Sequence, residues 1–146
     1  MDTHQASLPL AGLPARTRVR ERLLLAVFIG GAAGGLARAA LEQAWPTGGH
    51  GWPWVTFTVN IAGAALLAYF ITRLQERLPP STYPRPLLGS GLCGALTTFS
   101  TLQLEALELV HDGHALLGAA YALVSIGAGL LTTHLVSALV RRVPAS

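Results

Sequence analysis

The chain has 146 residues, of which 51% are hydrophobic and 12% are charged, and its formal net charge is +3. Soluble domains carry charge on about a quarter of their positions, so this composition excludes an ordinary soluble domain, which would lack a polar surface. Four uncharged stretches each approach the roughly 20 apolar residues that one helical crossing of a bilayer needs. They predict an all-α membrane protein with four transmembrane helices, at 23–41, 53–73, 86–109 and 115–140.

The first stretch carries glycines at a spacing that favours close helix packing. Gly30 and Gly34 lie four residues apart, as do Gly31 and Gly35. Small residues at this spacing let the backbones of two membrane helices approach each other. An alternative stays open, because an Arg-rich start followed by an apolar run and Ala37-Arg38-Ala39 also resembles a cleaved signal peptide.

The second stretch combines an interfacial start with polar groups on one face. Trp45, Trp52 and Trp54 gather at or before its beginning, as tryptophans do at the boundary between membrane and water. Thr56 and Asn60 are four residues apart, so both lie on one face of a helix. Ordinary hydrogen bonds between helices explain such residues, but Asn60 has two donors and two acceptor sites to satisfy and is a candidate functional residue.

The third stretch contains an unusual segment, Gly91–Leu102 (GLCGALTTFSTL). Gly costs about 1 kcal/mol relative to Ala in a helix, and Thr and Ser hydroxyls compete for backbone partners. We therefore predict a helix that is broken near the membrane midplane, around Gly94, in preference to a continuous helix. Carbonyl oxygens released there cannot face lipid, and unwound carbonyls in membrane helices commonly hold a cation.

The fourth stretch adds hydroxyl groups at helical spacing. Tyr121 and Ser125 are four residues apart, and both can donate a hydrogen bond to a small anion. Bonding between helices is again the simpler explanation for each residue taken singly. His134 is an ionisable residue within the same stretch, but its place near the helix end equally fits an interfacial role.

The distribution of arginine predicts the orientation of the chain. All ten basic residues are Arg, and nine of them lie in the two tails, 1–22 and 141–146, or in the connection 73–85. Basic residues are enriched on the cytoplasmic side of membrane proteins. We expect a multi-pass protein of the cell (inner) membrane with one transmembrane domain, 23–140, and both tails in the cytoplasm.

Other kinds of chemistry find little support in the sequence. Cys93 is the single cysteine and cannot form an internal disulfide. His111 and His114 flank Asp112, but a polar turn explains them better than a metal site does. No basic face interleaved with aromatic residues indicates nucleic-acid binding, and no nucleophile or nucleotide motif argues for an enzyme.

Motifs in the first three stretches resemble those of the Fluc (CrcB) fluoride channel family. The third-helix signature is matched by Gly91–Gly94 followed by Thr97–Thr101 (TTFST), which is the specific element. Gly34–Arg38 resembles the first-helix motif of the family, and Val59–Gly63 resembles the second. The likeness runs from about Leu23 to Val140.

This resemblance implies an antiparallel dimer with two fluoride pathways at the subunit interface and a structural, non-transported Na+ at its centre. Gly94 and Thr97 match the positions whose backbone carbonyls bind the sodium ion. The residues that match the fluoride pathway are Arg38, Thr56, Asn60, Phe99, Thr101, Glu105, Tyr121 and Ser125.

The resemblance also implies individual roles for some of these residues. The ring edge of Phe99, which is the positive part of the aromatic quadrupole, would face the anion. Arg38 would make the aqueous entrance electropositive. Thr101 and Glu105 would form a polar pair near the far end of the pathway.

Two departures from the family pattern bear on the partner subunit. Leu102 stands where the family has a second pore phenylalanine. The arginine bias is also stronger than in family members that insert in both orientations. We expect the second subunit to be either another copy or a paralogue of opposite topology.

The implied activity is passive export of cytoplasmic fluoride, which lowers its toxicity. The alternative is a proton-coupled transporter of the small multidrug-resistance type, which would need a carboxylate in the middle of the first helix, where this chain has Gly and Ala. A third possibility is an assembly protein that transports nothing.

Overall fold

A computed structural model describes residues 13–45, 51–77 and 83–143, and within these ranges the chain is almost entirely helical and has no strand. The remaining residues of the expected tails and connections, 1–12, 46–50, 78–82 and 144–146, lie outside the described part. The helices are α1 (Leu13–Ala44), α2 (Trp54–Arg77), the π-helix η2 (Arg85–Cys93), α3 (Gly94–Leu96), α4 (Phe99–His111) and α5 (Ala115–Arg142).

Three of the described helices are long and apolar enough to cross a membrane. They comprise 27 residues of α1 from Arg18, the 21 residues Trp54–Leu74 of α2, and the 28 residues of α5. The third stretch expected from the sequence is instead divided among η2, α3 and α4, each of which is shorter. The first helix begins at Leu13, before its expected start at residue 23, so part of the Arg-rich tail is helical.

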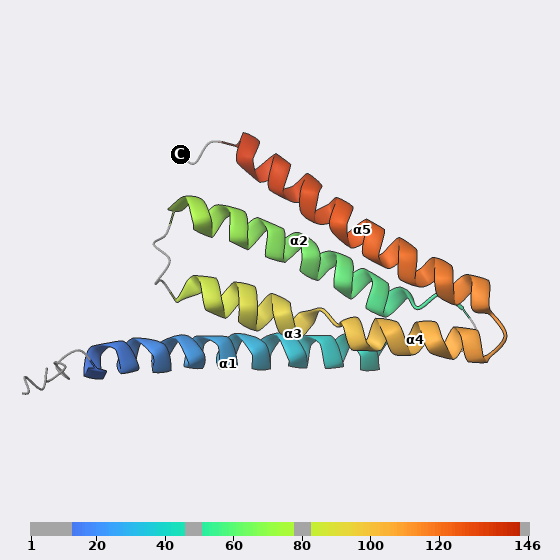
Figure 1. The fold of residues 1–146 in the computed structure, drawn as a ribbon, viewed down its shortest axis with the longest axis horizontal. Helices are drawn as coiled ribbons and strands as arrows, with labels where there is room; N and C mark the ends of the chain where they lie inside the picture. The colour runs from blue at the N-terminus through green and yellow to red at the C-terminus, as the bar shows by residue number, and fades with distance from the viewer. Residues whose placement is uncertain (1–12, 46–50, 78–82, 144–146) are drawn as a thin grey trace, which may run out of the picture.

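The helices form one bundle in which α2 lies between α5 and the part of the third segment formed by η2 and α3 (Figure 1). Helix α1 packs along η2 and α3, whereas α4 packs on α5. Helices α1 and α2 contact each other little. The divided third segment is therefore the element that joins α1 to the rest of the molecule.

Glycine allows the close approach of α1 and η2. A Cβ atom added to Gly30 would overlap the carbonyl oxygen of Leu87, and one added to Gly34 would overlap that of Leu92. The predicted close packing is thus confirmed for this pair. The second pair, Gly31 and Gly35, does not pack in this way, because an added Cβ would meet no atom within 4 Å.

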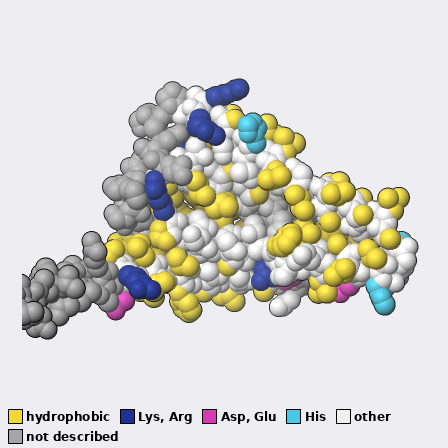
Figure 2. Space-filling model, viewed as in Figure 1, with side chains coloured by type: hydrophobic (Ala, Val, Ile, Leu, Met, Phe, Trp, Pro, Cys, Tyr) yellow, Lys and Arg dark blue, Asp and Glu magenta, His cyan; other side chains and the backbone are white. Residues whose placement is uncertain are grey.

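Apolar side chains cover the outside of the bundle. Phe28 is 72% exposed and Leu116 is 86% exposed, and Figure 2 shows hydrophobic side chains spread over the visible face. Most of the arginines in that view gather toward the end where α1 begins. The small interior cluster consists of Leu102, Leu109 and Tyr121. An apolar exterior with charge at the ends fits a bilayer better than water.

Candidate functional site

The third segment is interrupted at Thr97 and Thr98. Both residues have extended backbone angles, with φ −77° and ψ 150° at Thr97 and φ −140° and ψ 121° at Thr98. Gly94 is helical, with φ −65° and ψ −32°. The predicted break is therefore present, but it lies three residues beyond Gly94, at the β-branched threonines, which favour extended backbone.

Thr98 also starts the helix that follows the interruption. Its Oγ1 accepts a hydrogen bond of 3.1 Å from the backbone N–H of Thr101, as an N-cap residue does. The same hydroxyl donates to Oγ1 of Thr101 over 2.9 Å. The Thr101 hydroxyl therefore bonds to Thr98, whereas the carboxylate of Glu105 bonds to Thr56 and Tyr121.

Asn60 of α2 holds the interruption through two hydrogen bonds to one residue. Its Oδ1 accepts from the backbone N–H of Thr98 over 2.8 Å, and its Nδ2 donates to the carbonyl oxygen of Thr98 over 3.0 Å. The side-chain amide therefore replaces bonds that a continuous helix would have supplied. Sequence reasoning singled out Asn60 but missed this partner, because nothing in a pattern of spacings identifies a contact 38 residues away.

Arg38 of α1 holds the other side of the interruption. Its Nε donates to the carbonyl oxygen of Ala95 over 3.2 Å, near the C-terminal end of α3. Its Nη1 lies 3.1 Å from Oε1 of Glu42, one turn later on α1. A cation at the end of a helix satisfies carbonyls that have no helical partner. The carboxylate of Glu42 offsets the charge that was expected to make an entrance electropositive.

The end of α3 leaves neutral oxygens that could hold a cation. Within the described ranges, no hydrogen bond reaches the carbonyl oxygen of Gly94 or of Thr97, and the N–H of Thr98, which would pair with Gly94 in a helix, goes to Asn60. Unwound carbonyls of this kind suit Na+ in membrane proteins. The carbonyl oxygens of Gly94 and Thr97 are therefore of the kind that could hold the Na+ ion implied by the family resemblance.

A second polar site joins three helices at Glu105 of α4. Oγ1 of Thr56 donates to Oε1 of Glu105 over 2.7 Å, and the hydroxyl of Tyr121 donates to Oε2 over 2.6 Å. Tyr121 is fully buried and Thr56 is 2% exposed. The structure thus brings together three of the residues expected in the fluoride pathway, and both hydroxyl hydrogens point at the carboxylate.

Two buried donors lie beside this site without a partner in the described residues, the Oγ of Ser125 and the Nε1 of Trp52. Ser125 follows Tyr121 by one turn of α5. The ring of Trp52 meets that of Tyr121 edge to face, with 5.3 Å between centroids. Sequence reasoning assigned Trp52 only to an interfacial belt and missed its contact with Tyr121.

Phe99 and Leu102 both lie in the first turn of α4, yet they differ sharply in exposure. Phe99 is 62% exposed on the surface of the chain, whereas Leu102 is 4% exposed and packs in the cluster with Tyr121. The residue in place of a second phenylalanine is therefore part of the interior of this chain. Phe99, by contrast, does not reach the polar site at Glu105.

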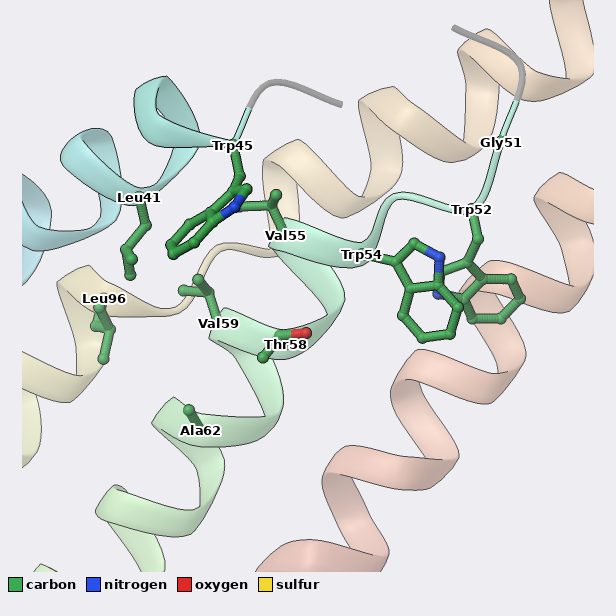
Figure 3. A pocket seen from close by; sticks show the side chains of 10 residues that line it. All are labelled: Leu41, Trp45, Gly51, Trp52, Trp54, Val55, Thr58, Val59, Ala62 and Leu96. Atoms are coloured by element: carbon green, nitrogen blue, oxygen red, sulfur yellow. The ribbon is translucent and has the colours of Figure 1, made fainter. Parts of the chain in front are cut away.

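Two cavities lie near the tryptophan-rich end. An apolar one of about 630 Å³ is lined by Leu41, Trp45, Trp52, Trp54, Val59 and others, and none of the predicted site residues lines it (Figure 3). A second, of about 420 Å³, is lined by Glu105, Glu108, His111 and Asp112 among others. The polar site at Glu105 therefore opens toward the turn between α4 and α5.

Comparison with known proteins identifies the family. The family model described as "CrcB-like protein, Camphor Resistance (CrcB)" matches residues 25–136. The chain belongs to the CrcB family. Residues 25–136 include the whole of the interrupted segment from η2 to α4, together with both polar sites described above.

Relatives of this CrcB chain carry the name of an ion channel, which is not a class of enzyme. "Fluoride-specific ion channel FluC 1" of Mycobacterium tuberculosis is 60% identical over 122 residues, which cover 84% of this chain and 92% of the relative. Streptomyces avermitilis has a "FluC 2" that is 35% identical, covering 81% of this chain and 80% of the relative. The "FluC 3" of the same organism is 41% identical, and the match covers 82% of this chain and 59% of the relative. With three membrane-length helices, this CrcB chain is a multi-pass membrane protein.

Proposed function

We propose that the chain is a subunit of a fluoride-selective ion channel that exports cytoplasmic fluoride passively. The observation that carries the proposal is the buried cluster of Thr56, Glu105 and Tyr121, with Ser125 one turn away. Polar groups at membrane depth are costly and mark ion pathways. Membership in a family whose compared relatives are named fluoride-specific channels supports fluoride as the ion.

Four crossings of the membrane follow if η2, α3 and α4 together form the third one. An interrupted crossing is tolerated where its free backbone groups face protein or a cavity, and Asn60 and Arg38 satisfy part of that need. Both termini then lie on one side. The arginines in the tails and in 73–85 support a cytoplasmic location for that side.

The second subunit is proposed to be inverted relative to the first, and it is either another copy or a paralogue. The strong arginine bias supports one fixed orientation, which favours a paralogue inserted the opposite way. Labelling of Val19→Cys and Ala115→Cys with a membrane-impermeant maleimide in intact cells tests this point. We expect label only at position 115; equal labelling of both would favour a homodimer with dual insertion.

A structural Na+ at the dimer centre is proposed to bind the main-chain oxygens of Gly94 and Thr97. Its charge would offset that of a nearby anion without any titrating side chain. The chain's own contribution is to hold these oxygens away from helical partners, through Asn60 and Thr98.

The free-energy cost of moving an ion into the protein determines what the pathway residues must do. Placing an ion in a low-dielectric interior costs several kcal/mol after relaxation, so hydroxyl and amide donors must replace its water. The hydroxyls of Thr56 and Tyr121 donate hydrogen bonds to the Glu105 carboxylate. They could therefore donate to fluoride only if that carboxylate turned away. Ser125, Thr101 and Asn60 would supply donors along the way, and the ring edge of Phe99 would act where two chains meet. A negative-inside potential favours anion exit by about 2.3 kcal/mol per 100 mV.

Fluoride efflux from liposomes that contain the purified protein tests the proposal. We expect rapid fluoride release when a valinomycin potential drives it, with no release of chloride. Absence of fluoride release both from these liposomes and from liposomes that also contain the paralogue would overturn the assignment. The paralogue should be added in a parallel sample, because a single chain conducts only if it forms homodimers.

One observation supports the alternative function, which is proton-coupled transport of a cationic drug. Glu105 is a carboxylate held between three helices, although it lies in α4 rather than in the first helix. A cationic dye in the same liposomes decides between the two functions. Uptake of the dye driven by a pH gradient, without fluoride flux, would favour the transporter.

A further inference from the structure

Two side chains from different helices hold the two ends of the interruption in the third segment. Arg38 of α1 bonds to the carbonyl of Ala95, three residues before Thr98, and Asn60 of α2 bonds to both backbone groups of Thr98. The residues between these two points are Leu96 and Thr97, whose carbonyls are left free of both side chains.

We propose that Arg38 and Asn60 are positioning residues that together form a clamp on the interruption and set the conformation of Ala95–Thr98. The resemblance gave these residues other roles, an electropositive entrance and a contact to the anion. Their observed hydrogen bonds go to main-chain atoms instead. Of the donor groups of Asn60, one N–H goes to Thr98, so contact with an anion could use only the other.

The pattern of occupied carbonyls explains why the clamp matters for the neighbouring oxygens. The carbonyls of Ala95 and Thr98 are taken by the clamp, whereas those of Gly94 and Thr97 are not. Without Asn60, both the N–H and the carbonyl oxygen of Thr98 would lose their hydrogen-bond partner. Without Arg38, the last turn of α3 would lose its cationic partner and fray.

Hydrogen exchange of the Thr98 amide, measured by NMR on the full chain in lipid bilayers, tests the Asn60 part of the clamp. Asn60→Asp keeps an oxygen that accepts from Thr98, so we expect exchange close to that of the wild type. Asn60→Leu removes the acceptor, and exchange should become about tenfold faster. Thr58→Val, an exposed position on the same helix, is the control. Wild-type exchange in Asn60→Leu, or equally fast exchange in Asn60→Asp, would overturn the inference.

The Thr97 amide reports on the Arg38 part, because its N–H donates to the carbonyl of Cys93 in the last turn of α3. Arg38→Gln should accelerate its exchange about tenfold, whereas Arg22→Gln, which removes the same charge from an exposed position, should not. An equal effect of both variants would show that charge alone matters and would overturn the clamp. Amides of α5 show in each variant whether the fold is intact.

The effect of the clamp on conduction rests on the proposed function. A separate measurement distinguishes failure of the clamp from failure of the proposed function. We expect Asn60→Leu and Arg38→Gln to raise the Na+ concentration needed for half-maximal fluoride efflux, whereas a purely anion-contacting role would leave it unchanged. If the wild type shows no efflux, the proposed function fails while the exchange data still decide the clamp. Unchanged amide exchange in the Asn60→Leu and Arg38→Gln variants, together with fluoride efflux by the wild type, would contradict the clamp and leave the proposed function standing.

Discussion

The hydroxyl of Tyr121 on α5 donates a hydrogen bond of 2.6 Å to the carboxylate of Glu105 on α4. The two residues are 16 positions apart and lie on either side of the turn that joins the last two helices. The other oxygen of the same carboxylate accepts from Thr56 of α2. One carboxylate thus connects three helices, and each substitution around it tests a different part of the site.

Tyr121→Phe removes the hydroxyl and keeps the ring in place. Glu105 then retains one of its two donors, and we expect stability to fall by about 1–3 kcal/mol. Fluoride efflux should fall about tenfold because a pathway donor is lost. The control is Tyr69→Phe, an exposed position on α2. Equal efflux in both variants would show that the hydroxyl of Tyr121 is not used.

Leu102→Phe introduces the second pore phenylalanine that the family resemblance implies at this position, yet we expect it to do harm. Leu102 is 4% exposed and packs with Leu109 and Tyr121. A larger ring in a filled core costs about 1–3 kcal/mol, and it should displace Tyr121. Unfolding by SDS in mixed micelles measures the loss, with Leu104→Phe, at a 57% exposed position, as control. Faster efflux with unchanged stability would contradict this expectation.

Phe99→Leu should separate conduction from stability. Phe99 is 62% exposed, so the folded chain should keep its stability within about 0.5 kcal/mol. If its ring edge contacts the anion where two chains meet, efflux should fall about fivefold, which corresponds to a typical aromatic contact. Phe28→Leu, also highly exposed, should change neither quantity. A loss of stability in Phe99→Leu alone would point to a packing role instead.

Gly34→Ala should destabilise the contact between α1 and η2. Its added Cβ would overlap the carbonyl oxygen of Leu92, and we expect a loss of about 1–3 kcal/mol. Gly35→Ala is the matched control, since no atom lies within 4 Å of its added Cβ, and replacing Gly by Ala in a helix gains up to about 1 kcal/mol. SDS unfolding of both variants measures the difference, and similar curves would contradict the observed packing.

Much of the fold could be predicted from the sequence, because membrane helices depend on length and hydropathy. The broken third segment was also predictable, since Gly, Thr and Ser weaken a helix locally. The break was predicted at Gly94 but lies three residues later. Glycine can adopt a helical or an extended backbone, whereas Thr97 and Thr98 favour the extended one. The partners of Asn60, Arg38 and Glu105 could not be predicted. Periodicity places a residue on a helix face, but the rotation of neighbouring helices decides which atoms meet.

The interruption at Thr97 and Thr98 also affects how the chain spans the membrane. Helix α4 has 13 residues and spans about 20 Å, which is less than the roughly 30 Å of hydrocarbon in a bilayer. A helix of this length does not cross a bilayer by itself, so it depends on its packing against α5 for its place in the bundle. Because α2 precedes the interrupted segment in the chain, Asn60 is available to pair with Thr98 as soon as that segment packs against it.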